Sequence, residues 1–135
     1  MTVREVPDIP GAETLVAWFG AWPTFHDAEI IHLHLNRAGS SGITIHAWNM
    51  TDKTYEADGR TFFVLEKHAV VTFELEDITA LELVDFNAQN VLSALEVWRD
   101  GESFHMHLHS SYGLSGSIEA ARMRVSLRPG KPSAE

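Results

Sequence analysis

Runs in which apolar and polar residues alternate recur along this chain of 135 residues. In residues 43–49, for example, Ile43, Ile45 and Ala47 alternate with more polar neighbours. A two-residue period predicts a β-strand with one buried face, and an Asp-Gly pair between two such runs, as at Asp100-Gly101, predicts a hairpin. Antiparallel strands are therefore expected over residues 29–36, 43–49, 61–65, 68–76, 81–86, 91–99, 102–109 and 117–128.

One short helix is expected before the first strand. Leu15, Trp18 and Phe19 recur at helical spacing, and Gly20 follows as a stop signal. Residues 50–60 are polar and are expected to form a long loop, with a short strand near Tyr55 as the alternative. The predicted fold is mainly β (α+β by strict count): a curled antiparallel sheet or a β-sandwich of seven to eight short strands with one short N-terminal helix.

The length suits a single domain spanning residues 1–135. Residues 1–10 contain two prolines and no periodic pattern, so we expect them to form a loosely held arm. Residues 129–135 begin with Pro-Gly-Lys-Pro and are expected to form a flexible tail. We find no internal repeat and no linker that would indicate a second domain.

Composition excludes several classes of protein. The chain has no cysteine, which excludes disulfides and cysteine-based zinc sites and agrees with a reducing compartment; we expect a cytoplasmic protein. Residues 1–20 lack the pattern of a signal peptide, and no apolar run approaches the roughly 20 residues of a membrane helix. The net charge of −9 argues against a nucleic-acid partner, because binding to phosphate depends on cationic side chains.

The charge is unevenly distributed along the chain. Residues 52–102 contain twelve acidic and four basic residues, whereas residues 122–131 contain four basic residues and no acidic one. The last strand is therefore expected to form a cationic stripe on an acidic body.

The segment of residues 19–30 is rich in aromatic side chains and includes Trp22-Pro23. We interpret it as an aromatic plug that pins the N-terminal segment onto a sheet. Asp27 is not expected to reach His26 in an extended chain, because neighbouring side chains point to opposite faces, and it should instead share a face with Glu29. Catalysis and partner contact remain alternative roles for this segment.

The chain has eight histidines, and His105, His107 and His109 alternate along one predicted strand. Their Cβ atoms should lie about 7 Å apart on one face, so two of the three could converge on a metal ion with a third ligand from a neighbouring strand. The simpler interpretation places the three histidines on the solvent-exposed face of the sheet, where protonation of neighbouring imidazoles at acidic pH would destabilise that face by charge repulsion. We expect no cofactor. The metal alternative also considers His32, His34 and His46 as further ligands.

No catalytic motif is present. The serines at residues 110–111 and 115–117 lack the strand–turn–helix context of a hydrolase nucleophile. The chain also has no phosphate-binding loop and no dinucleotide-binding fingerprint. We therefore expect a protein that is not an enzyme.

Four sequence segments together resemble a known family. Residues 22–30 read Trp-Pro-Thr-Phe-His-Asp-Ala-Glu-Ile; the others are the strand around Phe73, residues 84–90 and residues 113–116. Over about residues 18–127 the chain resembles the bacterial polymorphic-toxin immunity proteins of the immunity protein 50 family. The resemblance implies a cytoplasmic, non-enzymatic antidote that binds and neutralises a cognate toxin domain, and it supplies no catalytic residues.

On this interpretation the acidic span should attract a basic toxin. A histidine-based metal-binding protein or metal-dependent enzyme is the alternative function, and a homodimer formed through the aromatic plug is a further possibility. The candidate motif and partner-contact residues are Trp22, Phe25, His26, Asp27, Glu29, Asp52, Asp58, Glu74 and Glu82.

Overall fold

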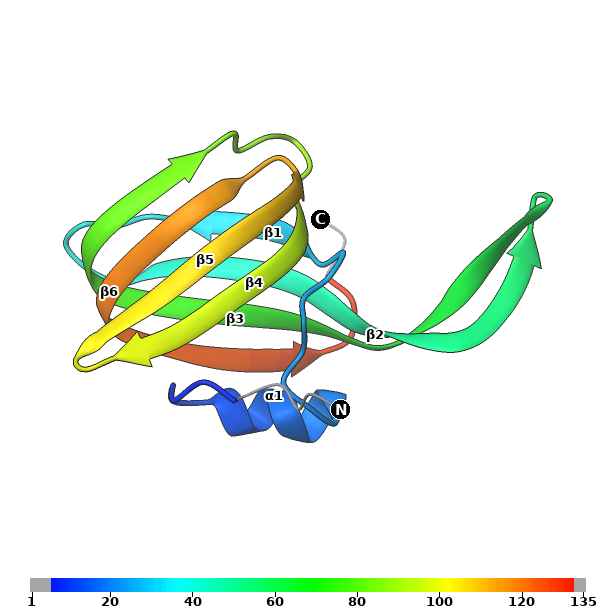
Figure 1. Ribbon diagram of the computed structural model, residues 1–135, viewed down its shortest axis with the longest axis horizontal. Helices are drawn as coiled ribbons and strands as arrows, with labels where there is room; N and C mark the ends of the chain where they lie inside the picture. Colours follow the sequence, from blue (N-terminus) through cyan, green and yellow to red (C-terminus); the bar gives the residue numbers. More distant parts are fainter. Residues whose placement is uncertain (1–5, 133–135) are drawn as a thin grey trace.

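The computed structural model describes residues 6–132, and the ends of the expected arm and tail lie outside this range. This part of the chain forms one helix and six strands (Figure 1). The elements are α1 (Ala12–Phe19), β1 (Glu29–His34), β2 (Ser41–Ala57), β3 (Arg60–Val84), β4 (Val91–Asp100), β5 (Ser103–Tyr112) and β6 (Ser115–Pro129).

The strands form a closed antiparallel barrel in the order β1-β2-β3-β6-β5-β4. Closure between β1 and β4 depends on a short stretch: the Ile30 N–H donates to the Asn90 carbonyl at 2.8 Å and the Leu92 N–H donates to the Ala28 carbonyl at 2.9 Å. The mainly β prediction is thus confirmed, and the curled sheet closes on itself rather than forming a sandwich.

The number of strands is lower than predicted because β3 is continuous. The predicted strands at residues 61–65 and 68–76 are parts of β3, and so is most of the one predicted at residues 81–86, since β3 ends at Val84. Lys67 and Asp77 interrupt its regular backbone with φ of 57° and 54°. A bulge changes the twist of a strand without ending it, so these interruptions resemble strand boundaries in the sequence.

The predicted helix and its stop are confirmed. α1 ends at Phe19, and Gly20 adopts a left-handed conformation with φ of 88° while its N–H donates to the Val16 carbonyl. The helix packs beside β6 and buries Leu15 completely. Just before it, Ile9 is buried and the Pro10 carbonyl accepts a hydrogen bond from the Val125 N–H. Within the described residues, no helix is long and apolar enough to cross a membrane.

Three aromatic side chains form the predicted plug. Trp22, Phe25 and Phe73 pack edge to face, with ring centroids 5.9 to 6.5 Å apart. Trp22 and Phe25 come from the segment between α1 and β1, whereas Phe73 lies in the middle of β3 and is fully buried. The cluster therefore fixes the N-terminal segment to the barrel core.

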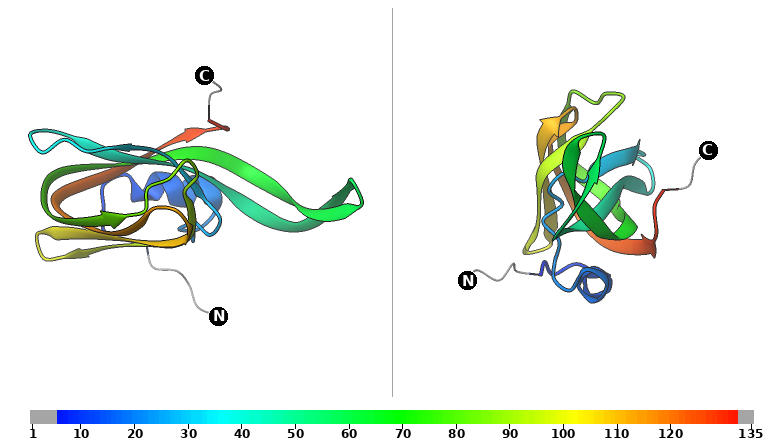
Figure 2. Two further views of the ribbon diagram at one scale, coloured as in Figure 1. Left: turned by 90° about the horizontal axis from the view of Figure 1, so that it is seen from above. Right: turned by 90° about the vertical axis from the view of Figure 1, so that its right-hand side faces the viewer.

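β2 and β3 continue far beyond the barrel as a two-stranded ribbon, residues 49–66 (Figures 1 and 2). The predicted long loop at residues 50–60 is therefore wrong: most of it is strand. Asp58 and Gly59 form the tip with φ of 50° and 73°, the positive values that a tight type I′ turn requires. Asp-Gly pairs favour this type of hairpin turn.

We predict that Trp22→Ala lowers the free energy of unfolding by about 3–5 kcal/mol, because it opens a cavity in a close-packed core. Urea unfolding measures the change. Phe63→Ala, at a side chain that is 53% exposed, is the matched control and should cost about 0.5 kcal/mol or less. Equal losses for the two variants would contradict the assignment of Trp22 to the core.

Candidate functional site

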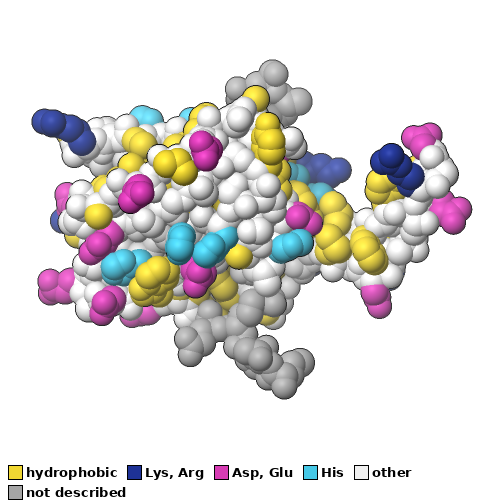
Figure 3. All heavy atoms as spheres, turned by 45° about the horizontal axis from the view of Figure 1, so that its top comes forward, with side chains coloured by type: hydrophobic (Ala, Val, Ile, Leu, Met, Phe, Trp, Pro, Cys, Tyr) yellow, Lys and Arg dark blue, Asp and Glu magenta, His cyan; other side chains and the backbone are white. Residues whose placement is uncertain are grey.

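The ribbon exposes large apolar side chains on both faces. Tyr55 and Phe62 stack at 5.5 Å on one face, and Phe63 follows on the other face because side chains alternate along a strand. Figure 3 shows these hydrophobic side chains on the projecting ribbon, with charges of both signs around its tip. The exposed apolar residues of the ribbon are Met50 (51%), Tyr55 (52%), Phe62 (40%), Phe63 (53%) and Leu65 (37%).

Among residues 6–132, no strand lies beside the outer edges of the ribbon. β1 pairs with β2 only up to His46, and β6 pairs with β3 only from Ala69 onward. Beyond these points the outward N–H and C=O groups of residues 49–57 and 60–66 face away from the chain's other strands. Such edges can accept a further strand from another molecule.

Two clefts lie at the base of the ribbon, and Trp48 lines both. One has a volume of about 270 Å³ and includes His26 and Met50. The other has a volume of about 380 Å³. Its further lining residues are Asp27, Glu29, His46, Leu65, His68, Gln89, Val91 and Lys131.

A histidine pair lies in the larger cleft. His46 Nε2 and His68 Nδ1 are 3.0 Å apart, so one ring donates a hydrogen bond and the other accepts it. Burial and the neighbouring His68 lower the pKa of His46 from its ordinary value of 6.5, against a smaller opposing effect of Glu29. Burial and then Lys131 lower the pKa of His68 as well. Both imidazoles are therefore held neutral at neutral pH.

The motif of residues 22–30 divides between core and surface. Trp22 and Phe25 are buried in the plug, at 6% and 3% exposure, which leaves no aromatic face for a homodimer interface there. His26, Asp27 and Glu29 line the clefts beside the ribbon. Asp27 does reach His26, at 3.3 Å, contrary to expectation. The reason is a φ of 66° at Asp27, which makes this segment a turn instead of an extended strand.

The acidic candidates occupy different environments. Glu74 accepts a hydrogen bond from Arg124 at 2.7 Å, and this guanidinium lowers the pKa of the Glu74 carboxyl. Arg122 likewise lies near Glu76 and Asp77. The predicted cationic stripe on β6 therefore pairs with acidic residues of β3.

Three further acidic candidates keep their charge unpaired. Asp52 and Asp58 lie on the ribbon, and Glu82 lies on β3 of the barrel. None of these three has an ion-pair partner within residues 6–132. These three carboxylates therefore present unpaired negative charge at the surface, whereas the charge of Glu74 is paired with that of Arg124.

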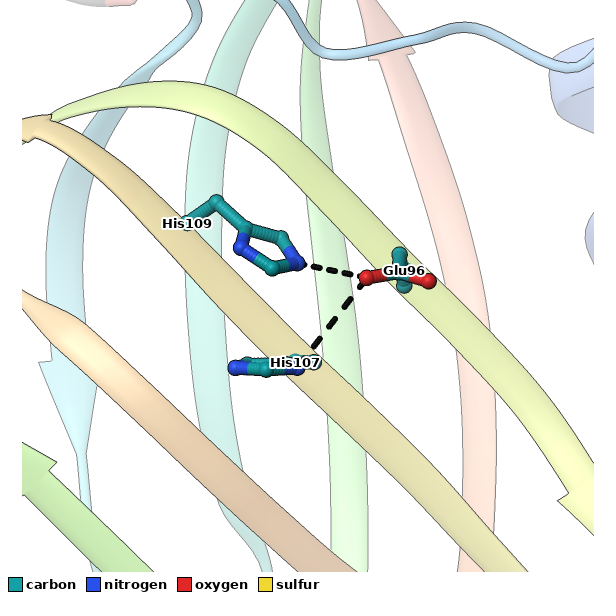
Figure 4. A group of neighbouring side chains, drawn as sticks. All are labelled: Glu96, His107 and His109. Atoms are coloured by element: carbon teal, nitrogen blue, oxygen red, sulfur yellow. Dashed lines mark hydrogen bonds and ion pairs between the residues drawn. The ribbon is translucent and has the colours of Figure 1, made fainter.

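The three histidines of β5 make different contacts. His105 stacks on Trp98 with ring centroids 5.1 Å apart. His107 and His109 instead approach Glu96 of the neighbouring strand β4 (Figure 4). His32 and His34 stack on each other on β1 and are not part of this group.

In a comparison with known protein families, the family model described as immunity protein 50 matches residues 11–127. The chain belongs to the immunity protein 50 family. No curated protein and no solved structure matches it. Membership confirms the resemblance seen in the sequence and identifies an immunity protein directed against a toxin. It favours a binding protein over an enzyme.

The histidine pair in the larger cleft should make the stability of the protein depend on pH. Because folding lowers the pKa values of His46 and His68, the unfolded chain takes up more protons below the ordinary pKa of 6.5. The free energy of unfolding should therefore fall as the pH drops from about 7 through 6.5 toward the lower pKa values of the folded state. Urea titrations across this range measure the slope.

The His46→Gln variant should show a shallower slope than the wild type. His34→Gln, a substitution on β1 outside the cleft, is the matched control and should keep the wild-type slope. Parallel curves for the wild type and His46→Gln would refute a contribution of the pair.

Proposed function

We propose that this immunity protein neutralises its cognate toxin by stoichiometric binding, and that the ribbon and the clefts at its base form the contact surface. The observation that carries the proposal is the row of exposed aromatic side chains on the ribbon. A two-stranded hairpin is only marginally stable alone in water, and large exposed apolar groups are typical of surfaces that contact another protein.

The ribbon offers two kinds of contact. Its aromatic side chains can enter an apolar groove, as aromatic anchors do at the centres of many interfaces. Its free edges can also pair with a strand of the toxin through main-chain hydrogen bonds. Charged residues, such as Lys53 along the ribbon and Asp58 and Arg60 at its tip, would disfavour pairing of these edges with other copies of the chain.

The clefts supply polar contacts next to this apolar surface. His26 and Asp27 are exposed at 62% and 45% of their side chains, and Glu29 lies near His46. These groups, together with Trp48, would give the interface a polar margin around the base of the ribbon. The most specific sequence motif and the ribbon then belong to one surface.

Charge supports a basic toxin as the partner. The net charge of −9 would speed encounter with a cationic protein, and the unpaired Asp52 and Asp58 place part of that charge on the ribbon. The absence of cysteine agrees with action in the cytoplasm. No residue is assigned a catalytic role.

We predict that a Phe62→Ser/Phe63→Ser double variant loses affinity for the cognate toxin. The expected loss is about 2 kcal/mol or more, roughly 30-fold in Kd, as for aromatic hot spots. Calorimetry with purified toxin measures the affinity, and co-expression measures protection of the cell. Leu81→Ser is the matched control, because Leu81 lies on the same strand within the barrel and is 42% exposed, against 40% for Phe62.

The outcomes separate the two parts of the proposal. Cells killed despite soluble wild-type protein would contradict neutralisation. Full protection of the cell by a folded double variant would agree with neutralisation by binding but would reject the ribbon as the contact surface.

A second prediction concerns charge. Asp52→Lys/Asp58→Lys should slow association several-fold at low ionic strength, and the effect should shrink as salt screens the charges. Glu74→Lys is an informative comparison, because the wild-type Glu74 charge is already neutralised by Arg124. An association rate that is insensitive to Asp52 and Asp58 at low salt would contradict steering by the ribbon.

A further inference from the structure

One group of side chains outside the ribbon has the composition of a metal site. Glu96 lies on β4 directly opposite His107 on β5, and His109 follows two residues later on the same face. Glu96 Oε1 is 2.5 Å from His109 Nε2 and 4.0 Å from His107 Nδ1. Figure 4 shows both imidazoles turned toward the carboxylate.

The distances suit a metal ion after a small adjustment. One ligand atom from each residue lies within 4.8 Å of the others. Ligand atoms about 2.1 Å from a tetrahedral metal lie about 3.4 Å from one another. Side-chain rotations that move the three ligand atoms by about an ångström would therefore bring them into place. The rigid register of β4 and β5 fixes the backbone positions for this rotation.

The surroundings favour a cation. The three side chains are 39% to 59% exposed, and none of them pairs with a lysine or arginine in residues 6–132. Glu119 lies opposite His105 on β6 and adds negative charge to the same face. Two imidazoles and one carboxylate are ligands that Zn²⁺, Ni²⁺ and Cu²⁺ accept, whereas Mg²⁺ prefers oxygen alone.

We infer that Glu96, His107 and His109 bind one divalent transition-metal ion of the Zn²⁺ class, with at least one coordination position open to solvent. The Glu96–His109 hydrogen bond would be exchanged for two metal–ligand bonds. His105 is not a ligand, because its ring is held against Trp98. The open position could accept a donor atom from a protein that approaches this face of the barrel.

Titration of untagged, chelator-treated protein with ZnCl₂ tests the inference. Calorimetry should show one equivalent bound with a micromolar Kd, and the melting temperature should rise with Zn²⁺ but not with Mg²⁺. His107→Ala and Glu96→Ala should each weaken binding at least about tenfold, a typical cost of losing one group of a metal site.

His105→Ala is the matched control, since it removes a histidine from the same row without removing a proposed ligand. It should bind zinc as the wild type does. The site would be overturned if the wild type showed no saturable zinc binding. It would also be overturned if His107→Ala and Glu96→Ala bound zinc as well as the wild type does, because the zinc would then be bound adventitiously by other histidines. Loss of binding on removal of His105 would reject the proposed ligand set.

Discussion

The packing of Trp22, Phe25 and Phe73 inside the barrel is the interaction on which the other features depend. It ties the segment between α1 and β1 to the middle of β3, the strand that continues into the ribbon. The turn after Phe25 then carries His26 and Asp27 to the base of the ribbon. One buried cluster therefore positions the polar part of the candidate surface.

β2 and β3 serve both the core and the surface, and the sequence revealed the first role more clearly. Inside the barrel their alternating residues matched a half-buried strand, so those segments could be predicted. On the ribbon, residues 61–65 were predicted as a strand but residues 50–57 were not, because their polar side chains resemble a loop. The irregular backbone at Lys67 and Asp77 and the register shift between Ile78 and Ala80 further divided β3 into apparent short strands. The Asp58-Gly59 pair between Tyr55 and Phe62 is a local feature that favours a hairpin turn.

Local spacing predicted which histidines share a face. The alternation of His107 and His109 placed two imidazoles on one face of a strand, and in the structure both lie near Glu96 of the neighbouring strand β4. Contacts between distant strands were not predictable in this way. The pairing of Glu74 with Arg124 depends on the register of β3 and β6, and the meeting of His46 with His68 depends on that of β2 and β3. The sequence alone fixes neither register.

The central claim is that the ribbon of an immunity protein 50 family member is the element that holds the toxin. Amide hydrogen exchange of the protein alone and with saturating toxin tests this most directly, because it reports the protected segments without any substitution. We expect slowed exchange in residues 49–57 and 60–66 and in the turn containing Asp27. Unchanged exchange throughout the ribbon, with protection confined to the β4–β5 face or to α1, would contradict it.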